Sequence, residues 1–206
     1  HRDLHLSLRR QRQMCIRDRL YHFWYRVVYI FHRLVHEGLQ VGKNMASLPL
    51  DENGNMIVRI GHSPDPDDAF MFHAMTTNAF PTPGYNFVHE LQDIETLNHR
   101  AMRQELEVSA VSIHAFPDIA EHYSLMNCGA SMGEGYGPMI VSKQGLSLED
   151  AKKSVIAVPG LKTSAYMGLR LAWGDVNVEV VPFDEIIPRI LDDTYSCGLI
   201  IHEGQL

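Results

Sequence analysis

The chain has 206 residues, 45% of them hydrophobic, which is enough for one full domain or two small lobes. Its three cysteines show neither a Cys-x-x-Cys motif nor metal-ligand spacing, which argues against a disulfide framework and favours a reducing compartment. The net charge of −7 is uneven: residues 1–44 carry nine basic and three acidic residues (+6), and residues 45–206 carry nine and 22 (−13). The acidic body disfavours nucleic-acid binding.

The first 55 residues differ in character from the rest. Leu20–Val35 is rich in aromatic residues, but charged residues interrupt it, so it has no apolar run long enough for a transmembrane helix. It also lacks a signal-peptide cleavage pattern, while a membrane-surface helix remains an alternative. Gln11–Arg19 resembles translated sequencing-adapter sequence. We therefore predict that residues 1–55 are a non-native or disordered extension, with Met45 or Met56 as the true start.

Strands and helices alternate from Met56 onward. Strands are predicted at Met56–Gly61, Tyr85–Leu91 and Glu107–Ile113, and helices at Asp67–Thr77, Asp93–Gln104 and His114–His122. This alternation is typical of a parallel sheet with crossover helices. A glycine-rich stretch, Gly129–Pro138, then leads into a strand at Met139–Ser142. We assign residues 56–142 to a first α/β lobe.

The alternation of helices and strands begins again near residue 143. Helices are predicted at Ser147–Lys153, Thr163–Trp173 and Phe183–Asp192, and strands at Ser154–Val158, Val176–Val181 and Cys197–His202. Residues 143–206 therefore form a second α/β lobe.

An acidic segment, Ser63–Asp68, connects the first strand to the first helix. Asp65 fits the N-cap position, Pro66 the first helical position, and Asp68 the first turn, where carboxylates favour the helix dipole. A calcium or magnesium site is the alternative, but the loop is too short to supply six oxygen ligands. Ser63 and the amides at the helix start are candidates for binding a ligand carboxylate.

A second helix start follows the strand at Ser154–Val158. Thr163 and Ser164 offer hydroxyl and amide groups to an anion, although ordinary N-capping by Thr163 explains the pattern equally well. Ser112, at the end of another strand, either reaches into a cleft or bonds to its own backbone.

His202 follows an apolar run at the end of the last predicted strand, where α/β sheets present ligand sites. An imidazole suits a general base at neutral pH, although most histidines in any chain are structural or exposed. The chain lacks a nucleophile elbow, a His-Glu-x-x-His motif and a dinucleotide-binding glycine pattern.

Five segments in order resemble one family. They are SPDPDDAF (63–70), DIETLN (93–98), GEGYGPMIVS (133–142), PGLKTSAY (159–166) and GLIIHE (198–203). Together they are similar to the 1,4-dihydroxy-6-naphthoate synthases of the futalosine route to menaquinone. The resemblance implies a fold like type II periplasmic binding proteins, with two α/β lobes and the ligand in the cleft. Because members are longer, it also implies a truncated second lobe.

The resemblance also implies an activity and its residues. The implied substrate is cyclic dehypoxanthinyl futalosine, a small molecule with a carboxylate, and the implied cleavage releases a dihydroxyacetone-type fragment. The family's catalytic base corresponds to His202, and its substrate-binding segments correspond to Ala110–Ser112, which includes Val111, and to Ser164-Ala165. With Ser63 and Thr163, these complete the candidate site. No metal or organic cofactor is expected, and a cytoplasmic location without stable membrane insertion is implied.

Two departures from the family pattern concern the substrate. The family's SPCPNDT becomes SPDPDDA, which places Asp65, Asp67 and Ala69 in the first loop. Ala110 stands where some members carry lysine. Chorismate dehydratase, on the same fold, and a solute-binding protein without catalytic activity are the alternatives, and DIETLN and GYGP favour the synthase.

Overall fold

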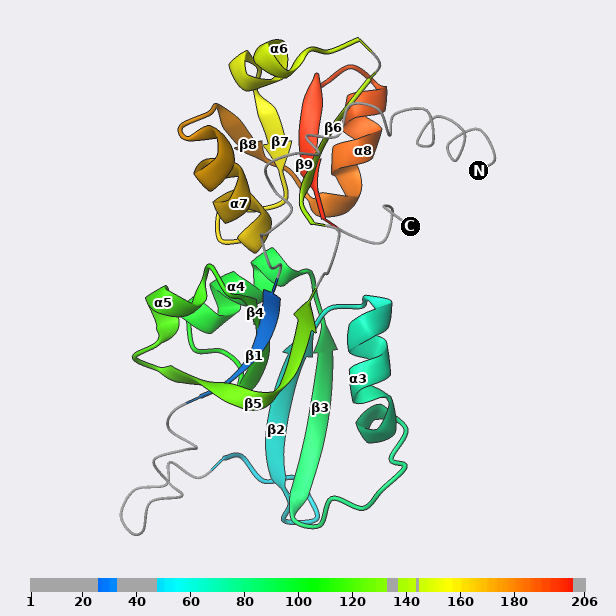
Figure 1. The fold of residues 1–206 in the computed structure, drawn as a ribbon. Helices are drawn as coiled ribbons and strands as arrows, with labels where there is room; N and C mark the ends of the chain where they lie inside the picture. The colour runs from blue at the N-terminus through cyan, green and yellow to red at the C-terminus, as the bar shows by residue number, and fades with distance from the viewer. Residues whose placement is uncertain (1–25, 33–47, 133–136, 144, 202–206) are drawn as a thin grey trace. The chain divides into compact units, whose positions relative to one another are not determined.

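The computed structural model describes residues 26–32, 48–132, 137–143 and 145–201. The chain divides into two compact units, one of them Arg26–Met132 and the other containing residues 133–206. The division falls ten residues before the lobe boundary expected from the sequence, because the strand Met139–Ser142 pairs within the second unit. Both units are α/β, as predicted (Figure 1).

The first unit contains a five-stranded mixed sheet. Its strands, in the order β3-β2-β4-β1-β5, are β3 (Tyr85–Leu91), β2 (Met56–His62), β4 (Val108–Ser112), β1 (Arg26–His32) and β5 (Tyr123–Met132). β2 is parallel to both β3 and β4, as the alternating pattern predicts. β1 is antiparallel to β4 and β5, so the sheet is not wholly parallel.

Two of these strands were not predicted. Arg26–His32 belongs to the segment for which a membrane-surface helix was the alternative, but this part of it is a strand, so that alternative is wrong here. β5 (Tyr123–Met132) includes the first four residues of the glycine-rich stretch Gly129–Pro138, for which no strand was predicted.

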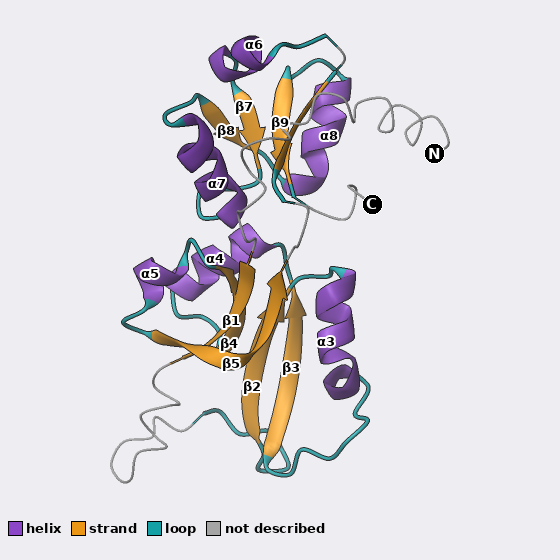
Figure 2. Cartoon of the chain, viewed as in Figure 1, coloured by secondary structure: helices purple, strands orange, loops and turns teal. Residues whose placement is uncertain are grey.

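Three helices cover this sheet. They are α3 (Pro66–Thr76), α4 (Ile94–Met102) and α5 (Phe116–Ile119). Figure 2 shows α3 on one side of the sheet and α4 and α5 on the other. The buried residues agree: Phe72 and Met75 of α3 pack on the cluster around Ile60, whereas Val111 packs with Ala101 of α4 on the opposite face. α5 is only four residues long, much shorter than the helix expected at His114–His122.

The second unit contains a four-stranded sheet. Its strands, in the order β6-β9-β7-β8, are β6 (Met139–Ser142), β9 (Cys197–Ile200), β7 (Ile156–Val158) and β8 (Val178–Val180). β9, β7 and β8 are parallel, and β6 is antiparallel to β9. The last strand ends at Ile200, two residues before the predicted end, and His202 lies outside the described residues.

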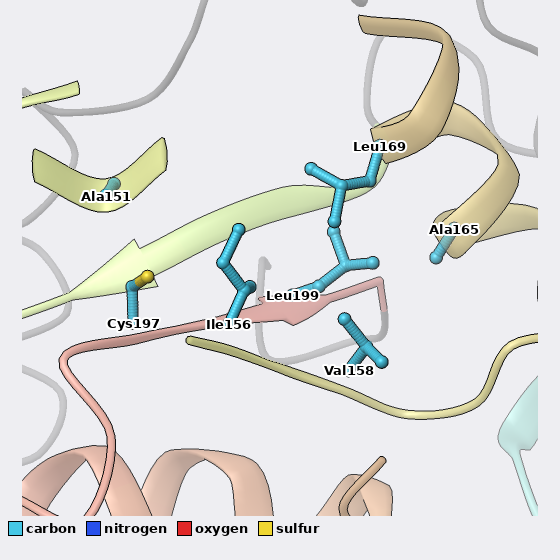
Figure 3. Packing of buried hydrophobic residues seen from close by; sticks show 7 residues of the cluster. All are labelled: Ala151, Ile156, Val158, Ala165, Leu169, Cys197 and Leu199. Carbon is cyan, nitrogen blue, oxygen red and sulfur yellow. The ribbon is translucent and has the colours of Figure 1, made fainter. Parts of the chain in front are cut away.

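Alternating side chains of β7 and β9 build a core on each face of this sheet. On one face, Ile156 and Leu199 pack against α6 (Leu148–Lys153) and α7 (Ser164–Trp173), as Figure 3 shows. On the other face, Ala157 and Ile200 pack against α8 (Phe183–Leu191). The sheet is covered on both faces, which explains its nearly continuous apolar strands.

Candidate active site

The loop between β2 and α3 is organised by hydrogen bonds among its own residues. The Ser63 hydroxyl donates to Asp65 Oδ2 at 2.6 Å and accepts from the Asp65 amide at 3.2 Å. The Ser63 amide donates to Asp68 Oδ2 at 2.7 Å, and Asp68 is buried. Asp65 and Pro66 occupy the N-cap and first helical positions predicted for them, although the Asp65 side chain does not cap the helix. Ser63, half-buried, therefore has a defined orientation.

His62, which sequence analysis did not single out, lies directly before this loop and is only 3% exposed. Its Nδ1 lies 3.1 Å from the Ser63 carbonyl oxygen, and its Nε2 lies 3.1 Å from Nδ1 of His89 on β3. Burial, and secondarily the charge of His62, lower the pKa of His89. The sequence offers one signal for this pair, a histidine at the last position of a buried strand.

The end of β4 places Ala110, Val111 and Ser112 in fully buried positions. Val111 is part of the hydrophobic core. Ser112 is held by Asn98, whose Oδ1 accepts from the Ser112 amide at 2.8 Å and whose Nδ2 donates to the Ser112 hydroxyl at 3.2 Å. The Asn98 amide group also donates to the buried Glu95 at 3.1 Å, which fixes its orientation. Asn98 was missed by sequence analysis, and its signal is a polar residue on the apolar face of a predicted helix.

The start of α7 is capped as the sequence predicts. Thr163 is the N-cap residue; its hydroxyl accepts from the Tyr166 amide at 3.2 Å and donates to the Gly160 carbonyl at 2.8 Å. Thr163, Ser164 and Ala165 are all buried.

The two helix starts differ in charge. Asp67 and Asp68 lie in the first turn of α3, whereas the first turn of α7 has no acidic residue. The positive end of a helix dipole attracts anions, and carboxylates in the first turn oppose that attraction. The start of α7 is therefore the more favourable place for a ligand carboxylate.

Strand pairing groups the candidate residues within each unit. In the first unit, Ser63 directly follows β2, and Ser112 is the last residue of β4, which is the parallel neighbour of β2. In the second unit, Thr163–Ala165 come after β7, which is parallel to the adjacent β9. Ligand sites of α/β sheets form at the carboxyl ends of such strands. The position predicted for the base, His202, lies outside the described residues.

The described residues hold neither a metal-ligand cluster nor a membrane-spanning helix. Among the described residues, no three His, Cys, Asp or Glu side chains gather in an arrangement that would hold a metal ion. In that same part of the chain, every helix is too short or too polar to cross a membrane.

Residues 58–206 match the family model described as menaquinone biosynthesis. The chain belongs to this menaquinone-biosynthesis family. It is 35% identical over 149 residues to a 1,4-dihydroxy-6-naphthoate synthase from Thermus thermophilus, covering 72% of this chain and 53% of the relative. It is 32% identical over 155 residues to a protein of the same name from Streptomyces coelicolor, covering 72% and 54%.

The chain is also similar to a protein from Archaeoglobus fulgidus whose crystal structure is known. The two share 45% sequence identity and their structures align with a TM-score of 0.67, over 73% of this chain and 55% of that one. The chain thus spans about half the length of the curated family members it matches.

Proposed function

We propose that this chain has 1,4-dihydroxy-6-naphthoate synthase activity, acting as a lyase on cyclic dehypoxanthinyl futalosine in menaquinone biosynthesis. The observation that carries the proposal is that two relatives at 32–35% identity bear this enzyme's name. The family match over 58–206 also contains every predicted site residue, from Ser63 to His202.

We infer that the two units correspond to the lobes of a fold like type II periplasmic binding proteins. The α/β construction of each unit, with helices on both faces of its sheet, supports this assignment.

The start of α7 is the proposed site for the substrate carboxylate. The first turn of α7 holds no acidic residue, so the amides at its start present the positive end of the helix dipole to an anion. The Ser63 loop suits a different kind of ligand group. Its hydroxyl hydrogen is already donated to Asp65, so the loop offers acceptor oxygens, which favour ligand hydroxyl groups.

His202 is the proposed general base. A neutral imidazole near pH 7 is able to remove a proton from the bound substrate and begin the cleavage that releases the small fragment. Exclusion of water around the base would favour this step.

The partner is a small molecule. The excess of acidic residues after residue 44 disfavours nucleic acid. A cytoplasmic location without membrane insertion is part of this proposal, and a cysteine spacing that suggests no disulfide framework supports a reducing compartment.

Incubation of the purified chain with cyclic dehypoxanthinyl futalosine, with separation and mass analysis of the products, tests the proposal. We expect 1,4-dihydroxy-6-naphthoate to form with the synthase substrate and chorismate to remain unchanged. Dehydration of chorismate would instead assign the sibling activity. Tight calorimetric binding of the synthase substrate without any product would indicate a solute-binding protein.

A further inference from the structure

Three aromatic rings join β2, β3 and α3 beside the Ser63 loop. The ring of His62 stacks on Phe72, with centroids 4.5 Å apart and planes 24° apart. His89 meets His62 edge-on at 5.2 Å and 79°, and it meets Phe72 edge-on at 5.7 Å. The predicted site and the family resemblance leave both histidines without a role.

The hydrogen bonds of the neutral pair allow one arrangement of protons. The Ser63 carbonyl oxygen only accepts, so His62 Nδ1 carries the hydrogen that reaches it. The Nε2 of neutral His62 is then an acceptor, and its partner, Nδ1 of His89, is the donor. His89 Nε2 is left as a bare lone pair, and this atom is buried without a hydrogen-bond partner in the structure described here.

Charging His62 would disrupt this arrangement. A proton on His62 Nε2 would face the hydrogen on His89 Nδ1, placing two donors 3.1 Å apart, unless His89 moved its own hydrogen from Nδ1 to Nε2.

His62 binds the carbonyl of Ser63, which is the polar group of that residue that the loop itself does not bind. The Ser63 amide is bound by Asp68 and its hydroxyl by Asp65, both from the loop or the first turn of α3. The carbonyl is bound by His62 of β2, which is in turn bound to His89 of β3. The two histidines therefore connect the orientation of the Ser63 peptide to the sheet.

We propose that His62, oriented by His89, is a positioning residue that fixes the Ser63 peptide for substrate binding. The contribution to substrate binding rests on the proposed function, whereas the effect on the Ser63 peptide does not. Because the pair contacts the loop rather than the reacting atoms, its loss should raise KM and leave kcat nearly unchanged.

Nuclear magnetic resonance of the full chain with ¹⁵N-labelled histidine tests the arrangement of protons. We expect both rings to be neutral Nδ1–H tautomers at pH 7, with assignments made from the signals lost in His62→Asn and His89→Asn. An Nε2–H tautomer at His62, or a charged His62 ring, would overturn the proposal.

The carbonyl carbon shift of Ser63 tests the coupling without reference to activity. His89→Leu removes the donor to His62 and should shift the Ser63 signal. His89→Asn retains an N–H near the Nδ1 position and should restore most of the wild-type shift. His73→Leu, on the exposed face of α3, removes an imidazole outside the pair and should leave Ser63 unaffected.

Kinetics with cyclic dehypoxanthinyl futalosine test the consequence for binding. His89→Leu should raise KM about fivefold, the effect expected for one neutral hydrogen bond, and His89→Asn should recover most of the difference. An unchanged Ser63 shift and KM in folded His89→Leu would refute the positioning role. A wild-type chain with the expected tautomers but no turnover would instead refute the proposed function, and a Ser63 shift with unchanged KM would refute the role in substrate binding.

Discussion

Gly198 of β9 lies where β9 is in close contact with the neighbouring strand β7 and with α8. A Cβ built there would be 2.5 Å from Ile186 Cγ2, 3.1 Å from Ile190 Cδ1 and 3.2 Å from the Ala157 carbonyl oxygen. Ordinary contact begins at 3.4 Å, so Gly198→Ala requires Ile186 to move by about 0.9 Å from its 2.5 Å separation. Ile186 is β-branched and helical, which leaves it essentially one rotamer, so α8 itself must shift.

Overpacking of this kind costs about 1–3 kcal/mol, and we expect about 2 kcal/mol for Gly198→Ala. Urea unfolding followed by tryptophan fluorescence measures the change, because Trp173 packs against the core on the other face of this sheet. Gly61→Ala is the matched control in the other unit. Its close contacts are the flexible ends of Leu106 and Leu97, so its cost should be smaller. A Gly198→Ala free energy of unfolding within about 0.5 kcal/mol of the wild-type value would refute the close packing of β9 on α8.

Two further predictions concern the polar contacts. Burial alone would raise the pKa of Glu107, but hydrogen bonds and charge from Arg59 outweigh it and lower the pKa overall. The resulting stabilisation is complete above the ordinary carboxyl pKa and is lost as pH falls through the folded value. The free energy of unfolding, measured in urea from pH 7 to pH 3, should therefore fall less steeply with pH in Glu107→Gln; equal slopes would contradict this assignment. Thr163→Ala removes the N-cap of α7 and should lower the free energy of unfolding by about 1 kcal/mol. Thr163→Ser keeps the hydroxyl and should retain most of the wild-type stability. Equal urea midpoints for the two Thr163 variants would argue against the cap.

The periodic parts of the fold were predictable from the sequence. Apolar runs bounded by capping residues located β2, β3, α4 and α7 within a few residues, since burial and capping act locally. The N-cap positions of Asp65 and Thr163 followed from the same local chemistry.

The other elements depend on distant partners. β5 contains glycine and polar residues and exists as a strand through its pairing with β1, which no local pattern indicates. The antiparallel direction of β6 is likewise set by β9, some 60 residues away. The connection of His62 to His89 could not be foreseen, because it requires the register of β2 on β3.

For the site, the sequence identified chemical groups but not their surroundings. Ser63 and Thr163 are polar residues placed by the loops predicted for them. Val111, by contrast, is a core residue, and Ser112 is oriented by an asparagine from another element. Burial and hydrogen bonding between elements are properties of the assembled sheet, so the role of a strand-end residue follows only from its neighbours.

The His202→Asn variant tests the central claim most directly. Substrate binding is measured by calorimetry with cyclic dehypoxanthinyl futalosine, and product formation is measured on the same preparation. His122→Asn, an exposed histidine, is the matched control. We predict that His202→Asn binds the substrate with nearly wild-type affinity and forms no 1,4-dihydroxy-6-naphthoate, while His122→Asn is fully active. Normal turnover by His202→Asn would contradict the assignment of the base.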